Sequence, residues 1–215
     1  MKIALLGATG NVGSRTLAEA VSAGHEVVAY VRRPEAVPSG PGVTVVKGEL
    51  DDGPALTRAL EGSEVLIVAV TGSMRDTSFT QRMYPTVVKA AKDAGVARLV
   101  VVSVFGAGDT AGKASGIAKL VYRTVLRGFL GDKAKSESLV VESGLEWTLV
   151  YPVNLKDAPV RAEWTAVPLD RVAKVPGMPT LPFGNVAKTL VDLAGGRGGS
   201  GKRILVTTAD GWKSV

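Results

Sequence analysis

Short apolar runs alternate with helical stretches along the chain. The runs are rich in β-branched residues and are continuous, which is typical of parallel strands that helices cover on both faces. This pattern predicts strands at 3–6, 26–31, 43–46, 65–70, 99–104, 147–151 and 204–207. Between them, apolar residues recur at helical spacing and predict helices at about 11–23, 54–61, 78–94, 115–128, 133–143 and 184–194.

The alternation of strand and helix predicts an α/β fold of the Rossmann type, a doubly wound and mainly parallel sheet with helices on both faces. A length of 215 residues is typical of one domain, so we expect a single domain over 1–215. The proline-rich segment 155–182 has no periodicity, and we expect a substrate-side loop there because long irregular segments are usually functional. The glycine-rich stretch 195–201 predicts a flexible connector.

The amino-acid composition excludes several kinds of chemistry. The chain has no cysteine, which excludes disulfides, thiolate metal sites and a cysteine nucleophile, and its one histidine excludes a histidine-rich metal site. The first apolar run is too short for a signal peptide, and no run approaches the roughly 20 residues that span a bilayer. We therefore expect a cytoplasmic protein with no membrane partner.

The net charge of +6 comes from basic residues that are spread along the chain. Nucleic-acid binders usually gather such charge in a patch with aromatic residues, so we expect no nucleic-acid partner. Lys119, Arg123 and Arg127 share helical spacing and indicate a solvated helix face, or alternatively a rim that attracts anions. We expect a monomer or a small homo-oligomer.

The strongest motif is Gly7-x-x-Gly10-x-x-Gly13, which follows the first strand and opens the first helix. Glycines allow the sharp turn, the approach of a pyrophosphate to the backbone, and close packing of helix on strand. The helix N-terminus also presents free N–H groups to phosphates. In this strand–turn–helix context the motif predicts a nicotinamide dinucleotide site.

The end of the second strand bears on which cofactor binds. NAD sites usually carry an acidic residue there to bind the ribose hydroxyls, but this chain has Arg32 and Arg33. Guanidinium groups form charge-assisted hydrogen bonds with a 2′-phosphate, which favours NADP(H). The alternative is that both are solvated charges at a strand end.

Six segments together resemble a known family: 7–13, 32–33, 48–51, 103–108, 133–137 and 143–152. On these motifs the chain resembles the atypical short-chain dehydrogenases/reductases, and more narrowly NAD(P)-binding proteins of the NmrA-like and biliverdin-IXβ/flavin reductase type. The resemblance covers about 2–195.

The resemblance implies a role for each matching position along the cofactor. The residues that would cradle the pyrophosphate are Thr9, Gly10, Asn11 and Val12. Those flanking the adenine would be Glu49 and Leu50, and those bordering the ribose would be Ala69, Val70 and Thr71. Ser103 and Pro152 would border the nicotinamide, with Ser103 and Lys133 as the candidate catalytic residues.

The chain also departs from the family at its proton donors. Many of these enzymes use a Tyr-x-x-x-Lys pair, and Phe129 stands here in place of the tyrosine. Val104 replaces a second serine, and Asn154 replaces the histidine of the biliverdin/flavin reductases. The departures predict that solvent supplies the proton of any reduction.

This interpretation leads to two expectations about the candidate catalytic residues. Lys133 and Glu137 lie one helical turn apart, so we expect an ion pair that holds the lysine as a charged group with a structural or ribose-binding role. Ser103 has no base beside it in the sequence, so we expect a hydroxyl that is a poor acid.

The leading hypothesis is an NADPH-dependent reductase of a planar conjugated molecule such as a flavin or quinone. Such an acceptor disperses negative charge and needs orientation more than a strong acid. Phe105 and Trp164 are the candidate stacking walls, and Asn154 is a third substrate contact. The alternatives are a non-catalytic NADP(H)-sensing protein, expected to lack a cavity opposite the nicotinamide, and a tailoring ketoreductase or epimerase.

Overall fold

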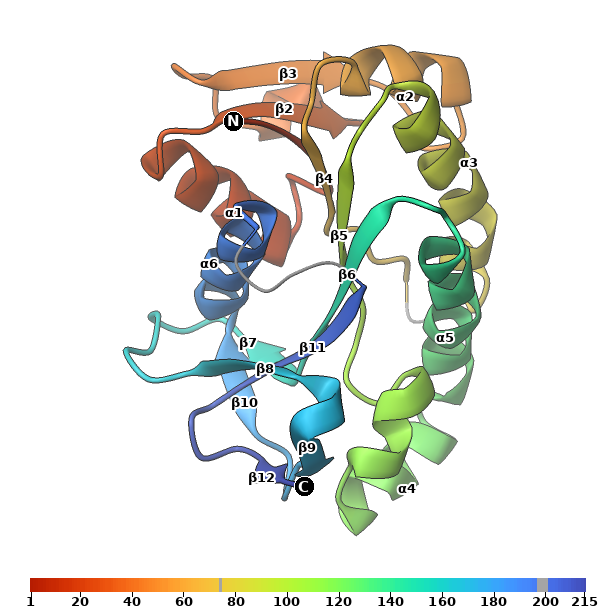
Figure 1. Ribbon diagram of the computed structural model, residues 1–215, viewed down its shortest axis with the longest axis vertical. Coiled ribbons are helices and arrows are strands. Elements are labelled where there is room, and N and C mark those ends of the chain that lie inside the picture. The colour runs from red at the N-terminus through yellow and green to blue at the C-terminus, as the bar shows by residue number, and fades with distance from the viewer. Residues whose placement is uncertain (74, 197–200) are drawn as a thin grey trace.

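A mostly parallel sheet crosses the centre of the molecule in the computed structural model, which describes residues 1–73, 75–196 and 201–215 (Figure 1). Its strands, in spatial order, are β3 (Val43–Lys47), β2 (Glu26–Val31), β1 (Lys2–Leu6), β4 (Val65–Val68), β5 (Arg98–Val102), β6 (Glu146–Pro152), β11 (Lys202–Thr207) and β8 (Thr165–Pro168). All neighbours pair in parallel except β8, which is antiparallel to β11.

The order of the strands reverses beside β1. From β1 the chain moves outward through β2 to β3, and then returns to β4 on the other side of β1. Ligands of doubly wound sheets bind beyond the carboxyl ends of the strands at such a switch point. The predicted Rossmann-type fold is confirmed, and the glycine-rich turn that follows β1 lies at this point.

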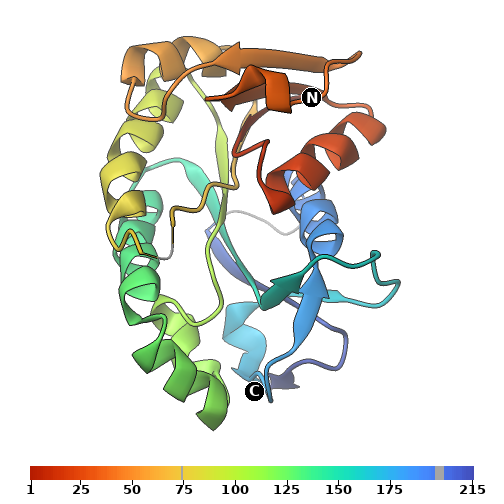
Figure 2. The same ribbon diagram turned by 180° about the vertical axis from the view of Figure 1, so that it is seen from behind.

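Helices cover both faces of the sheet (Figures 1 and 2). On one face α1 (Asn11–Ser22) packs on α6 (Phe183–Ala194), and on the other α3 (Phe79–Asp93) packs on both α2 (Gly53–Leu60) and α5 (Arg127–Val141). The short α4 (Gly116–Thr124) precedes α5.

Helix α5 begins well before the predicted start at 133. Gly128 and Gly131 disfavour a helix in the sequence pattern, but tertiary packing overrides their propensity. A Cβ atom on Gly128 would lie 2.4 Å from Thr77 Cγ2, so this glycine lets the first turn approach the segment before α3.

The prediction of an irregular loop over 155–182 is wrong. The segment contains β8 and four further short elements: β7 (Asn154–Lys156), the 3-10 turn η3 (Leu169–Arg171), β9 (Val172–Lys174) and β10 (Thr180–Pro182). Strand β10 pairs with β7, and β9 pairs with β12 (Lys213–Ser214). Strands of three or four residues are too short to show a period of two, and the prolines in this segment argue against a strand in the sequence pattern.

Both faces of the sheet bury an apolar core, in which Leu5, Ile67, Val100 and Leu190 are fully buried. Part of the connector predicted at 195–201 lies outside the described residues. In the described ranges, no helix has the length and apolar character that crossing a membrane requires.

Asp132 on α5 caps the N-terminus of α3. Its Oδ2 accepts hydrogen bonds from the backbone N and the Oγ1 of Thr80, at 2.8 and 2.7 Å. Its Oδ1 accepts from the backbone N and the Nε2 of Gln81, at 3.1 and 3.0 Å. Burial acts to raise the pKa of Asp132, but these hydrogen bonds outweigh it and lower the pKa. The carboxylate thus satisfies N–H groups that the helix leaves unpaired, and it fixes α3 against α5.

We expect Asp132→Ala to lower the free energy of unfolding by about 2–4 kcal/mol, because buried donors lose a charged acceptor. Asp93→Ala is the matched control, since Asp93 forms an exposed i,i+4 ion pair with Lys89 and should cost at most about 0.5 kcal/mol. Urea unfolding at neutral pH measures both values. Equal costs for the two variants would contradict the capping role.

Candidate functional site

Two cavities adjoin at the carboxyl ends of the parallel strands. The Arg32 cavity, of about 540 Å³, includes Thr9, Arg32, Glu49 and Leu50 in its wall. The Ser103 cavity, of about 430 Å³, includes Asn11, Val12, Ser103, Phe105, Pro152 and Asn154. Gly10, Ala69 and Thr71 line both cavities. The two therefore form one groove that crosses the switch point of the sheet.

The turn between β1 and α1 is built from close backbone contacts. Gly7 has a φ of +89°, and a Cβ atom on it would lie 2.4 Å from the carbonyl oxygen of Ala69. A Cβ atom on Gly13 would lie 2.0 Å from the carbonyl oxygen of Gly7. Packing within the protein thus requires these two glycines.

Gly10 differs from the other two glycines of the motif. Its backbone is extended, and the nearest atom to a Cβ there would be the Gly7 oxygen at 3.3 Å. Gly10 is also the N-cap of α1, whose first turn, within the described residues, has neither a side-chain cap nor an acidic residue. Backbone N–H groups and a positive dipole end therefore face the groove, which fits a pyrophosphate.

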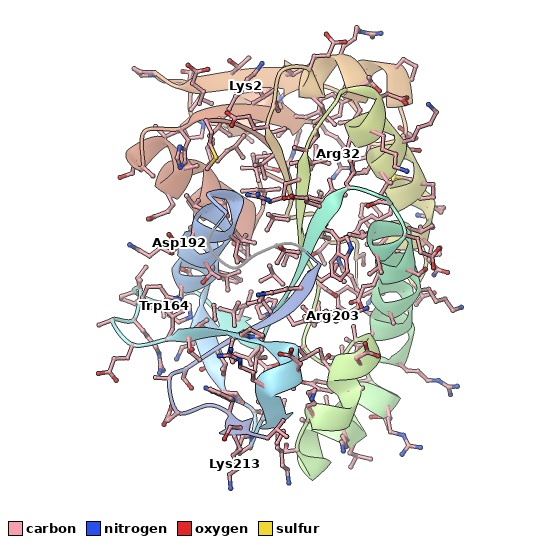
Figure 3. All side chains as sticks on the ribbon, viewed as in Figure 1. Lys2, Arg32, Trp164, Asp192, Arg203 and Lys213 are labelled. Atoms are coloured by element: carbon pink, nitrogen blue, oxygen red, sulfur yellow. The ribbon has the colours of Figure 1, made fainter. Side chains whose placement is uncertain are left out.

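The Arg32 cavity brings together the residues predicted to hold the adenosine end of a dinucleotide. Arg32 is exposed and contributes to the wall, and Figure 3 shows it among the side chains at the upper part of the sheet. Arg33 is equally exposed but is not part of the described wall. Tyr30 Oη donates to the backbone oxygen of Glu49 at 2.9 Å, which fixes the turn that carries Glu49 and Leu50.

Lys133 lies beneath the groove rather than in its wall. The side chain is 1% exposed, and its Nζ donates to the backbone oxygen of Val70 at 3.2 Å. Burial lowers the pKa of Lys133 to about 8, although Asp132 and Glu137 act in the opposite direction. Lys133 thus holds the segment after β4 that forms part of the cavity wall.

The predicted ion pair between Lys133 and Glu137 is replaced by other contacts. Glu137 Oε1 accepts a hydrogen bond from Ser103 Oγ at 2.6 Å, and its Oε2 accepts one from Tyr151 Oη at 2.8 Å. The expectation that Ser103 has no base beside it is therefore wrong. The partner comes from α5, 34 residues further along the chain, and only the fold brings the two groups together.

The Ser103 end of the groove has largely apolar walls. Phe105 meets Tyr122 edge-on, with ring centroids 6.4 Å apart. Asn154 lines the same cavity, and its Nδ2 donates to the backbone oxygen of Pro179 at 3.2 Å. Tyr122, Leu126 and Phe183 also line this wall. The sequence analysis did not predict them, because in the sequence they are only apolar residues within or beside predicted helices.

Trp164 does not lie where the stacking hypothesis needs it. Its Nε1 donates to Thr189 Oγ1 on α6 at 3.2 Å, and it lines neither cavity among the described residues. Figure 3 shows Trp164 beside α6, away from Arg32. The tryptophan anchors its segment on α6. From the segment 155–182 only Leu155 contributes to the described wall of the Ser103 cavity.

Outside residues 74 and 197–200, no three or more His, Cys, Asp or Glu side chains gather where they would hold an ion.

Comparison with known proteins identifies the family. A family model described as NAD(P)H-binding matches residues 7–196, so the chain belongs to this NAD(P)H-binding family. A curated relative, an isoflavone reductase homolog from Zea mays, is 32% identical over 117 residues, which are 49% of this chain and 35% of that protein. The match thus spans about a third of the relative's length.

Solved structures show the same fold. A short-chain dehydrogenase/reductase from Veillonella parvula in complex with NADP has a TM-score of 0.82 and 18% identity, covering 99% of this chain and 96% of the other. An anaerobillin reductase from Escherichia coli O157:H7 has a TM-score of 0.78 and 23% identity, covering 98% of both chains. A Streptococcus pneumoniae protein assigned as an NADH-flavin reductase has a TM-score of 0.80 and 20% identity, covering 97% and 99%.

Because Gly10 and Gly13 have different surroundings, substitutions at the two positions should affect cofactor binding and protein stability separately. Gly10→Ala should leave the melting temperature nearly unchanged but weaken nicotinamide cofactor binding by tenfold or more (about 1.4 kcal/mol), because the methyl group occupies the path of the pyrophosphate. Gly13→Ala should instead destabilise the protein, because its methyl group meets the Gly7 carbonyl. Calorimetric titration and thermal melting of both variants test this. Parental cofactor affinity in Gly10→Ala would contradict the role of Gly10.

Proposed function

We propose that the chain is an NADPH-dependent reductase of a planar, conjugated small molecule such as a flavin or quinone. The observation that carries the proposal is the Ser103 cavity, which continues past the Gly10 turn to the apolar side chains of Phe105, Tyr122 and Phe183. A groove that served the dinucleotide alone would have no need of this wall. The volume of about 430 Å³ and the apolar lining of this cavity favour a reductase over a sensing protein.

The groove has room and chemistry for a dinucleotide along its length. Thr9, Gly10 and the first turn of α1 suit the pyrophosphate, and Arg32 suits a phosphate on the adenosine ribose. The nicotinamide would then lie toward Ser103 and Pro152, where a bound cofactor supplies a hydride to an acceptor. The NADP complex of the Veillonella protein supports this reading, whereas the streptococcal relative is assigned to NADH.

The acceptor end suits a flat aromatic molecule. Phe105 is fixed by its edge-on contact with Tyr122, and Leu126 and Leu155 extend the apolar surface. Such walls orient a ring system by contact area, with Asn154 as a polar group at the rim. A conjugated acceptor spreads the charge left by reduction, so orientation supplies much of the catalysis. The anaerobillin and flavin reductases among the structural neighbours support this substrate class.

The direct test is NADPH oxidation by the purified protein with a free flavin and a soluble quinone as acceptors. We expect turnover that saturates in both substrates. A protein that binds NADPH but reduces neither acceptor would contradict the proposed reductase and favour the sensing function.

The choice of cofactor is tested by two neighbouring arginines. Arg32→Ala should weaken NADPH binding about 10–100-fold, equivalent to the 1.5–3 kcal/mol of a hydrogen bond to a charged group, and should leave NADH binding nearly unchanged. Arg33→Ala removes the same charge outside the described cavity wall and should have a much smaller effect. Calorimetry with both cofactors measures these affinities. Equal affinity of the parent protein for NADPH and NADH would refute the preference.

A further inference from the structure

A hydroxyl and a carboxyl group form a buried pair behind the Ser103 cavity. Ser103 directly follows β5 and lines the cavity, although only 3% of it is exposed. Its Oγ donates to Glu137 Oε1 at 2.6 Å, and Glu137 is itself only 6% exposed. Tyr151 Oη, fully buried on β6, donates to the other carboxyl oxygen at 2.8 Å. One member of the group thus faces the cavity and the other two stand behind it.

We propose that Ser103 and Glu137 together deliver the proton that an acceptor takes up when it is reduced in this cavity. Ser103 is the group that touches the acceptor. Glu137 is a positioning residue, which orients the Ser103 hydroxyl and holds the proton that replaces the one Ser103 gives away. The proposal rests on the proposed reductase function.

The transfer balances in protons and electrons. A nicotinamide cofactor, when bound, would supply a hydride ion to the acceptor, that is, one proton with two electrons. The O–H bond of Ser103 then breaks as a new bond to hydrogen forms on the acceptor atom that carries the negative charge. When Glu137 is protonated, its hydrogen bond with Ser103 reverses: the carboxyl group donates to Ser103 Oγ, and the Ser103 hydroxyl is free to face the acceptor. As Ser103 gives its proton away, the carboxyl proton moves to Oγ, which restores the hydroxyl. The resulting carboxylate again accepts from Ser103 and Tyr151. One proton from water returns Glu137 to its starting form.

The surroundings of Glu137 suit a proton store. The charged or titratable groups around it are Tyr151 on β6, Arg203 on β11, Asp109 on the 3-10 turn η2 (Gly108–Lys113), Tyr84 on α3 and Lys133 on its own helix. Burial raises the pKa of Glu137, against hydrogen bonds from Ser103 and Tyr151 and the charge of Arg203, which lower it. The carboxyl group therefore keeps its proton to a higher pH than an exposed glutamate does.

A third cavity borders two of the charged groups that act on Glu137. It has a volume of about 410 Å³, and its wall includes Asp109 and Arg203. The Arg203 Nε atom lies 3.5 Å from Asp109 Oδ2. The charge of Arg203 acts to lower the pKa values of both Tyr151 and Glu137. Figure 3 shows Arg203 on the side of the sheet that α5 covers. Asp109 and Arg203 thus connect the surroundings of Glu137 to an opening that is separate from the Ser103 cavity, and we expect the returning proton to come from this side.

The test combines the pH dependence of turnover with a direct titration of Glu137. Turnover of NADPH with a soluble quinone should fall as the pH rises through the pKa of Glu137, because the protonated form is the donor. Glu137→Gln should lower kcat about 10²-fold and remove this pH limb, with KM and NADPH affinity unchanged. Glu137→Asp should recover part of the rate and the limb. Glu142→Gln, an exposed control at the end of the same helix, should behave like the parent.

Carbon-13 NMR of carboxyl-labelled glutamate gives a readout that needs no activity. The Glu137 signal, identified by its loss in Glu137→Gln, should titrate above the ordinary glutamate range. Tyr151→Phe and Ser103→Ala each remove a hydrogen bond that favours the carboxylate, so both should raise this pKa further. Tyr151→Phe should move the pH limb of kcat upward by the same amount, whereas a purely structural role would lower kcat equally at every pH.

The outcomes separate the proton pair from the reductase proposal. An unchanged pH profile in Glu137→Gln, or a Glu137 signal that titrates as an exposed glutamate and ignores Ser103→Ala, overturns the pair. A parent protein that binds NADPH but reduces no flavin or quinone contradicts the reductase instead. In that case the NMR titration still decides whether Ser103 and Glu137 are coupled.

Discussion

Helix α1 begins in direct contact with strand β1, and this contact sets the geometry of the whole carboxyl edge of the sheet. A side chain at Gly13 would meet the Gly7 carbonyl, and one at Gly7 would meet the carbonyl of Ala69 on the neighbouring segment after β4. Three pieces of backbone are therefore locked together where the strand order reverses. The first N–H groups of α1 point along the helix axis beyond its N-terminus, which lies at the groove, and Gly10 leaves the approach open.

Helix α5 organises the other side of the groove through buried polar groups. Asp132 holds the start of α3, Lys133 holds the backbone after β4, and Glu137 holds Ser103 after β5. Burying each of these polar groups costs free energy, and its hydrogen bonds to a partner on a different element offset that cost. The same helix therefore fixes the walls of both cavities and places a carboxyl group behind Ser103.

The sequence predicts the fold, and most of the residues predicted to bind the cofactor do line one groove, because the glycine turn and the strand ends are local signals. It fails where partners are distant. The i,i+4 spacing of Lys133 and Glu137 predicted an ion pair, yet burial directs Lys133 to Val70 and Glu137 to Ser103. Trp164 is a second example, because its hydrogen-bond partner Thr189 on α6 is 25 residues away and is not evident from the segment 155–182. Glu137 matches the family motif, but nothing in the sequence indicates that its side chain would contact Ser103 at the end of β5.

A crystal structure of the protein with NADP⁺ and a planar acceptor tests the central claim, that the two cavities form one groove for cofactor and substrate. The account predicts the adenosine half in the Arg32 cavity, the pyrophosphate at Gly10, and the acceptor ring against Phe105 within hydrogen-bonding reach of Ser103 Oγ. Cofactor density confined to the Arg32 cavity, or an acceptor bound away from Ser103, would contradict it.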